Sequence, residues 1–306
     1  MCVVPTEGTK SSPLRSLVAE EAGTPPSVAV AELCEAARER FGNSVAAVLF
    51  YGSCRRAEAP GGLYDLYVLL DDYRALPPLE RWLARALAPN VYHLQADETS
   101  AGTPRLRAKC AVVSVTDFVR GTSPRWFHST LWARFAQPVT LAYARDPNVR
   151  ELVEQALARA VTTFLRRIRC LVPDTRDPAE LWTRGLAASY ATELRSETAA
   201  RARELYGANA DFFDAAARLV PPVSLTAAEQ RRERALWRVR RVTGKLMSVA
   251  RVLKSAYTFD GGLDYIVWKL ERHSGRSIEV PDKVRKTPAL HLWGFFWRLY
   301  REGVFR

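Results

Sequence analysis

Two short apolar runs near the N-terminus constrain the fold more than any other feature of the chain. Val45-Ala-Ala-Val-Leu-Phe50 and the run from Leu63 to Leu70 are each too short for a lone buried helix, and both are typical of buried strands. The first run ends at Gly52-Ser53, and the second carries Asp65 among apolar neighbours. We therefore expect a sheet in which a glycine–serine turn lies close to a carboxylate on the next strand.

The pattern changes after about residue 125. Before it, the runs 91–94 and 108–115 indicate further strands, and 28–41 and 73–88 have helical spacing. After it, the chain has long segments rich in Ala, Leu, Arg and Glu, with helical periodicity. These segments are Trp126 to Phe135, Val149 to Cys170, Pro178 to Tyr206 and Leu225 to Tyr257.

This order predicts an α/β (α+β) fold with two parts. A mixed-sheet domain is expected over residues 27–147, and an all-helical domain over residues 148–306. Residues 1–26 carry Thr, Ser, Pro and Glu without the apolar core of a signal peptide, and we interpret them as a flexible lead.

No apolar run approaches the roughly 20 residues of a membrane span. The five cysteines are scattered and show no CxxC spacing, which argues against a disulfide framework or a zinc site. We expect a cytoplasmic protein that is at most peripheral, on the inner face of a membrane.

The formal net charge of +12 is concentrated at the C-terminus. Residues 231–306 hold 18 of the 45 basic side chains but only 7 of the 33 acidic ones. A local basic surface of this kind favours a phosphate-bearing partner such as a nucleotide, a nucleic acid or an anionic lipid surface. The alternative is a solvated helix face without a partner.

The residues at the two strand ends suit a triphosphate. Glycine lets the backbone approach closely at Gly52, and backbone N–H groups with the Ser53 hydroxyl bind phosphate oxygens. A carboxylate on the neighbouring strand, Asp65, would hold Mg²⁺ against those phosphates. The alternative is a hairpin in which Asp65 only caps the end of its strand.

These residues resemble the polymerase-β-like nucleotidyltransferase superfamily, in which Gly-Ser precedes two acidic residues separated by one spacer. Here Tyr67 stands in the place of the second acid. The chain is more similar to the mitochondrial translocator assembly and maintenance family, which pairs a Tyr-Gly-Ser strand end with a single Asp. That family consists of CTP:phosphatidate cytidylyltransferases, which make CDP-diacylglycerol. The similarity covers roughly residues 45–145 and includes the segments 108–114 and 131–139, with Gln137 in place of the family's lysine.

The resemblance implies that Gly52 and Ser53 hold the phosphates of CTP and that Asp65 holds Mg²⁺. It also implies that Lys109 and Arg134 are cationic partners of the triphosphate or of phosphatidate.

Physical chemistry supports the two cations independently. A lysine inside an apolar strand is costly unless its ammonium reaches an anion or water, and arginine binds phosphate with a bidentate fork. The alternative for each is a surface side chain that extends to solvent. Arg55, just past the glycine–serine turn, is a further candidate for phosphate binding.

Two C-terminal segments add candidates. Lys254 precedes an Asp260-Gly-Gly turn, and the segment up to His273 suits either a lid that carries Lys254 to the nucleotide or a helical hairpin that closes the core. Residues 283–306 are basic and aromatic, as in an amphipathic helix at an anionic membrane surface. A helix that docks on its own domain is the alternative.

We therefore expect a Mg²⁺-dependent phosphatidate cytidylyltransferase that forms CDP-diacylglycerol and pyrophosphate from CTP and phosphatidate at a membrane surface. One alternative is a nucleotidyltransferase with a non-lipid acceptor. Another is a catalytically inactive domain that binds nucleic acid, although few aromatic residues lie among the basic residues of 231–256, which argues against nucleic acid as a partner. The sequence does not indicate an oligomeric state.

Overall fold

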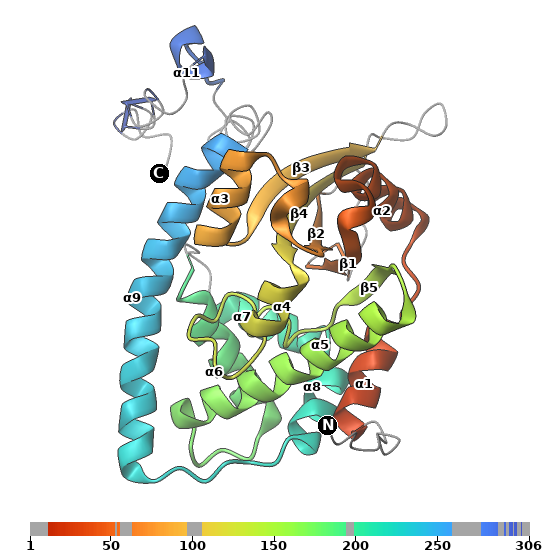
Figure 1. Cartoon of the computed structure of the whole chain (residues 1–306). Coiled ribbons are helices and arrows are strands. Elements are labelled where there is room, and N and C mark those ends of the chain that lie inside the picture. Colours follow the sequence, from red (N-terminus) through yellow and green to blue (C-terminus); the bar gives the residue numbers. More distant parts are fainter. Residues whose placement is uncertain are drawn as a thin grey trace, which may run out of the picture.

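The fold consists of one sheet with helices on both faces and a long helix along one side (Figure 1). The computed structural model describes residues 12–52, 54–55, 63–96, 106–193, 199–258, 277–286, 291, 294–295, 297–298 and 301. Within these residues the expected α/β fold class is confirmed, because a mixed sheet is combined with many helices.

The five-stranded sheet has the order β3-β4-β2-β1-β5. Its central pair, β2 and β4, runs parallel, and the other neighbours run antiparallel. The four strands expected from the sequence are confirmed, and β5 is an additional one. The strands are β1 (Val45–Tyr51), β2 (Leu63–Leu70), β3 (Asn90–Ala96), β4 (Leu106–Ser114) and β5 (Thr140–Ala144).

Helix α2 (Val28–Phe41) covers one face of the sheet together with α3 (Pro78–Ala86). Val30, Leu33 and Ala37 recur at helical spacing and are fully buried against the strands. The helix begins at the N-cap Ser27 and ends at a glycine with positive φ. Short 3-10 turns flank these helices at η1 (Gly42–Ser44) and η2 (Tyr73–Ala75).

The other face packs against the remaining helices in one large apolar cluster. This cluster contains strand residues such as Tyr67 and helix residues such as Phe164, so the helices after residue 147 share a core with the sheet. Residue 147 therefore marks a change in secondary structure, and the packing continues across it. The elements on this side are α1 (Pro13–Ala22), α4 (Val115–Gly121), α5 (Pro147–Ile168), η3 (Arg169–Leu171), α6 (Pro178–Tyr190), α7 (Ala199–Gly207) and α8 (Ala210–Leu219).

Residues 13–22 form helix α1, so the prediction of a flexible lead over residues 1–26 is wrong for this segment. Ser12 caps the helix and Pro13 occupies its first turn, a combination that favours helix initiation. Leu14 and Val18 lie one turn apart and are buried in the large cluster. The helix forms because this apolar stripe finds partners on α5 and α8.

The helix predicted over 126–135 is also wrong. The chain forms consecutive turns over 129–136, with helix-like bonds of 2.9 Å from the N–H of Ala133 to Ser129 O and from that of Phe135 to Leu131 O. Every residue of 131–136 except Arg134 is buried. This burial on several sides differs from an amphipathic surface helix, which buries only one face.

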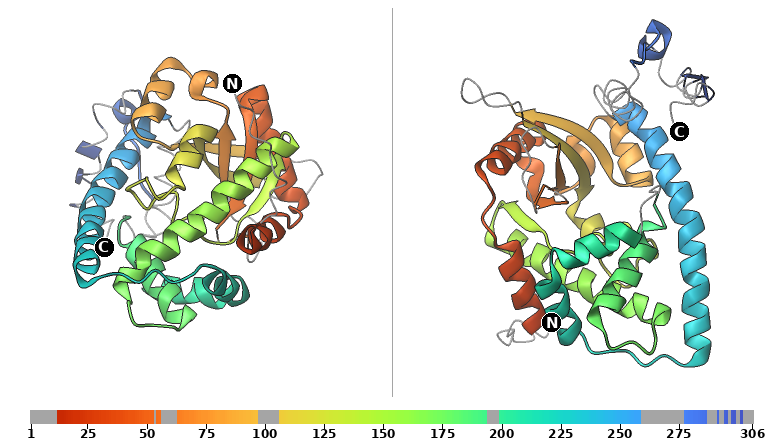
Figure 2. Two further views of the ribbon diagram at one scale, coloured as in Figure 1. Left: turned by 60° about the horizontal axis from the view of Figure 1, so that its bottom comes forward. Right: turned by 180° about the vertical axis from the view of Figure 1, so that it is seen from behind.

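Helix α9 (Ala227–Thr258) runs along one side of the molecule, as the two opposite views show (Figures 1 and 2). Its inner face ties distant segments together through hydrogen bonds. Trp237 Nε1 donates to Arg167 O at 2.9 Å, Arg240 Nε to Phe127 O at 2.9 Å, and Arg251 Nε to Ala88 O at 3.0 Å. No helix in the described part of the chain combines the length and apolarity needed to cross a membrane.

The predicted lid or hairpin over 260–273 lies outside the described residues. Of the predicted membrane segment 283–306, the structure describes most of the short helix α11 (Asp282–Lys286) and a few later residues, among which Phe295 is buried and Trp297 is exposed. Membrane binding by this segment stays a prediction.

Candidate active site between the sheet and the helical layer

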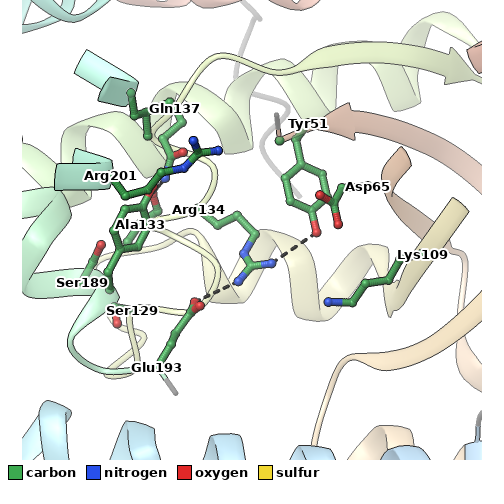
Figure 3. A pocket seen from close by; sticks show the side chains of 13 residues that line it. Tyr51, Asp65, Lys109, Ser129, Ala133, Arg134, Gln137, Ser189, Glu193 and Arg201 are labelled. Carbon is green, nitrogen blue, oxygen red and sulfur yellow. Dashed lines mark hydrogen bonds and ion pairs between the residues drawn. The ribbon is translucent and has the colours of Figure 1, made fainter. Parts of the chain in front are cut away.

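A polar cavity of about 230 Å³, the site cavity, lies where the ends of β1, β2 and β4 meet the helical layer (Figure 3). It contains the predicted residues Gly52, Asp65, Lys109 and Arg134 among its walls. The lining consists of Tyr51, Gly52, Asp65, Lys109, Ser129, Ala133, Arg134, Gln137, Ser189, Tyr190, Glu193, Arg201 and Leu205.

Three neighbouring strands build the sheet wall of this cavity. Asp65 on β2 is opposite Tyr51 on β1 and Lys109 on β4 in the strand register. Directly opposite residues project from the same face of a sheet, so the three side chains form one row. In Figure 3 the Asp65 carboxylate lies beside the ring of Tyr51, and Lys109 extends into the cavity from β4.

Gly52 forms the corner at the end of β1. Its φ is +90°, a conformation that residues with a side chain rarely adopt. A Cβ atom at this position would lie 2.7 Å from Oδ2 of Asp65 and 3.3 Å from its Cβ. The corner therefore requires glycine both for its backbone and for its contact with the carboxylate. The predicted closeness of the glycine turn and the strand carboxylate is confirmed.

Arg134 and Glu193 form the helical wall. The Arg134 guanidinium donates to Glu193 Oε1 at 2.8 Å and to the Tyr51 hydroxyl at 3.2 Å (Figure 3). Partial burial lowers the pKa of Arg134, but the charge of Glu193 and the hydrogen bond to the Tyr51 hydroxyl raise it, so the pKa of Arg134 stands well above its usual value. Burial raises the pKa of Tyr51, which keeps its phenol protonated. Arg134 is thus a fixed cation at the cavity.

The remaining nucleotide-binding predictions have different outcomes. Ser53 lies outside the described residues. Arg55 forms an ion pair with Glu21 of α1 and donates to Thr140 Oγ1 at 3.0 Å, beside the corner but outside the lining of the site cavity. Its structural partners tie α1 to β5, and phosphate binding by Arg55 stays a prediction.

The prediction that Lys254 contacts the nucleotide is wrong, because its ammonium lies away from the site cavity. It is buried and donates to Pro89 O at 2.7 Å, to Asn90 Oδ1 at 2.9 Å and to Leu87 O. A buried ammonium is tolerated when acceptors surround it, and these three acceptors hold it. Lys254 therefore fastens α9 to the connection between α3 and β3, and the prediction of a nucleotide contact is wrong for this structure.

Sequence reasoning missed the helical wall apart from Arg134. Glu193 follows the end of α6, and Arg201 belongs to α7, within a segment predicted as one continuous helix. Helix α6 ends at Tyr190 and α7 begins at Ala199, and both side chains line the cavity. Neither residue lies in a recognisable motif, so no local signal marks them. Tyr51 belongs to the Tyr-Gly-Ser strand end of β1, but only the cross-strand register places it opposite Asp65.

The donor set fits a magnesium ion that is shared with a substrate. In the part of the chain that the structure describes, no three His, Cys, Asp or Glu side chains gather into a group that holds a metal by itself. Mg²⁺ commonly uses one or two carboxylates together with substrate phosphates and water. Asp65 is a carboxylate on a cavity wall that also carries cations, so the residues present suit this minimal form of coordination.

The sequence matches no protein-family model and no curated protein. Among solved structures, a nucleotidyltransferase-like protein from Exiguobacterium sibiricum aligns over 90% of this chain and 92% of its own, with 11% identity and a TM-score of 0.27. A likeness this weak carries no argument about the site.

Proposed function

We propose that the chain is a Mg²⁺-dependent nucleotidyltransferase. The observation that supports this most is the contact between the Gly52 corner and the Asp65 carboxylate, at a cavity that also holds Lys109 and Arg134. A glycine corner lets backbone N–H groups approach phosphate oxygens, and a neighbouring carboxylate suits the metal that accompanies a triphosphate.

In the proposed reaction an acceptor oxygen forms a bond to the α-phosphorus of the nucleotide. The bond from that phosphorus to the β-phosphate oxygen breaks, and pyrophosphate leaves. Bound Mg²⁺ would supply charge neutralisation on the phosphates. Arg134 and Lys109 would bind and orient the triphosphate, because two cations on the walls of a partly enclosed cavity stabilise negative charge more than water does.

For the substrates we propose CTP and phosphatidate, with CDP-diacylglycerol as the product. The resemblance of the Tyr51-Gly52 strand end and the single Asp65 to phosphatidate cytidylyltransferases supports this choice. A phosphate monoester is already an anion near neutral pH, so its attack requires no strong base. A site with one strand carboxylate is compatible with that chemistry. Residues 283–306 would hold the enzyme at the anionic membrane surface.

The test uses the full-length protein, Mg²⁺ and vesicles that contain phosphatidate. Each common ribonucleoside triphosphate is added in turn, and pyrophosphate and labelled lipid are measured. We expect lipid labelling with CTP, and a loss of at least about a hundredfold in Asp65→Asn. Asp71→Asn is the matched control, because Asp71 follows the same strand at its other end and pairs with Arg145 at 2.6 Å. Unchanged rates in Asp65→Asn would contradict the proposed site.

Glu193 supports a second candidate, a nucleotidyltransferase whose acceptor is a hydroxyl group. A neutral hydroxyl is a poor attacker, and a carboxylate that removes its proton contributes about 10²–10⁴-fold to the rate. Glu193 is a carboxylate on the cavity wall beside Arg134. Glu193→Gln separates the two candidates. With a hydroxyl acceptor kcat falls by this factor at a similar KM, and with phosphatidate kcat is retained.

A further inference from the structure

The outer face of α9 carries an apolar stripe that the rest of the molecule leaves exposed. This outer seam consists of Ala235, Val239, Val242, Leu246 and Val249, and the last four have exposed fractions of 49%, 61%, 65% and 39%. The inner face of the same helix makes the hydrogen bonds that tie α9 to the body of the molecule (Figure 1).

The spacing of the outer seam is that of a coiled coil. Its residues alternate at intervals of four and three, which is the pattern of the a and d positions in a heptad. Such a seam is one or two side chains wide and fits a single helix laid along it. The helix presents this pattern over its central turns, and α9 extends beyond it at both ends.

A column of cations borders one edge of the seam. Arg231, Arg238 and Lys245 recur at intervals of seven residues and are all exposed. In the heptad defined by the seam they occupy the g position, which in coiled coils selects the partner by charge. Alongside the seam the opposite edge is uncharged and consists of Leu236, Thr243 and Ala250, whereas Glu229, seven residues before Leu236, accepts hydrogen bonds from Thr226.

We propose that the outer seam of α9 docks an amphipathic helix of a partner protein, and that this helix places carboxylates against the cation column. Charge complementarity selects this occupant. A second copy of the chain would bring column against column in an antiparallel pair, and column against the uncharged edge in a parallel pair. Neither arrangement gives Arg231, Arg238 and Lys245 an opposite charge.

Other occupants fit the surface less well. A helix at a membrane surface presents a broad apolar face that commonly includes Trp, Phe or Leu, whereas this seam is narrow and consists mostly of valine. Nucleic acid would satisfy the cations through its phosphates but would leave the valines and Leu246 exposed to water. An acidic amphipathic helix covers both the seam and the column. This inference is independent of the proposed catalytic function.

The test uses the full-length protein and two synthetic peptides of about 28 residues, or four heptads, with Leu at a and d. One peptide has Glu at every e and g position, and the other has Lys there, so that like charges keep each from pairing with itself. Binding is measured by fluorescence anisotropy of labelled peptide. We expect saturable binding of the Glu peptide and no binding of the Lys peptide.

Variants locate the binding on α9. Leu246→Asp is expected to weaken binding of the Glu peptide by about tenfold or more, because it places a charge at the most exposed large apolar residue of the seam. The double variant Arg238→Glu with Lys245→Glu should lose the Glu peptide and gain the Lys peptide. Arg184→Glu, a single charge reversal at an exposed position of α6, should bind as the parent does.

Several results would overturn the proposal. These are no binding of the Glu peptide, equal binding of both peptides, or binding that Leu246→Asp and the charge-swapped variant leave unchanged. Self-association of the parent protein that Leu246→Asp abolishes would assign the seam to a second copy. Binding to phosphatidylserine vesicles or to duplex DNA that depends on Leu246, without peptide binding, would assign it to those surfaces instead.

Discussion

The two walls of the site cavity place their functional groups in different ways. On the sheet wall, Asp65 and Lys109 are adjacent because the register of β2 and β4 puts them side by side. On the helical wall, Arg134 comes from a compact turn and Glu193 from the end of α6, and an ion pair of 2.8 Å joins them.

The difference shows which parts of the site depend on the core. The hydrogen bonds of the sheet define the sheet wall locally. The helical wall depends on packing, in which the Trp182 ring stacks on Phe164 at 4.9 Å and its Nε1 donates to Phe213 O at 2.8 Å. We therefore expect changes at the sheet wall to affect activity most directly, and changes that loosen the helices to act through stability.

The largest expected effect is that of Gly52→Ala, which tests the sheet wall. The new methyl group would push the Asp65 carboxylate out of its position, and misplacement of a catalytic group by about 1 Å lowers rates by about a hundredfold. The positive φ adds a stability loss of roughly 1–2 kcal/mol. Activity with CTP and the free energy of unfolding in urea are the measurements.

Gly42→Ala is the matched control for Gly52→Ala. Gly42 also has a positive φ, of +62°, but a Cβ there would meet no atom within 4 Å. It should lose a similar stability and keep its activity. Equal activity of the two variants would show that the contact between Gly52 and Asp65 has no catalytic role.

The next effect is that of Lys254→Met, which tests how α9 is fastened to the connection between α3 and β3. The substitution leaves the acceptors at Leu87, Pro89 and Asn90 buried without their donor, which costs roughly 2 kcal/mol of unfolding free energy. Lys245→Met, on the exposed face of the same helix, should change stability by less than about 0.5 kcal/mol. Urea unfolding measures both. A Lys254→Met variant as stable as the Lys245→Met variant would show that this buried ammonium does not fasten the helix.

The smallest effect concerns Asp146, at the junction where β5 leads into α5. Its side chain accepts hydrogen bonds from the backbone N–H groups of Val149 and Asn148, which lower the pKa of Asp146 below its usual value. A carboxylate with a lowered pKa in the folded state stabilises the protein above its unfolded pKa of about 3.9. That stabilisation is lost as the pH falls through the folded pKa.

Asp146→Asn retains a capping side chain without the charge. The parent should therefore melt at a higher temperature than Asp146→Asn near pH 6, and the difference should shrink as the pH falls from about 4 through the lowered folded pKa. Melting curves over this range provide the measurement. A difference that is constant with pH would mean that the charge of Asp146 contributes nothing to the helix.

Local patterns predicted most of the regular structure. The apolar runs predicted β1 to β4 because buried strands need continuous apolar residues, and the helical periodicity predicted α2, α5 and α9. The prediction failed for the expected helix over 126–135, where the chain forms consecutive turns over 129–136. It also missed α1, although Ser12-Pro13 followed by Leu14 and Val18 is a recognisable helix start.

The sequence likewise predicted some residues of the site and missed others. Gly52 and Asp65 belong to strand ends, where residue type and spacing carry the chemistry, and the structure brings them into contact. Lys254 has the residue type of a phosphate ligand, but no local feature distinguishes a cation at a cavity from one that fastens a loop. No local feature of the sequence predicted Glu193 as a site residue, because its position depends on where α6 ends relative to the sheet.

The sequence by itself determined the alternation of strands and helices, the glycine corner and the strand carboxylate. These features depend on interactions between residues that are close in the chain or paired in a ladder. Only the tertiary structure decided that Arg134 and Glu193 meet at the same cavity, that Lys254 is buried among carbonyl groups, and that the outer seam of α9 faces solvent. Such placements depend on how whole elements pack, and packing is a property of the complete core.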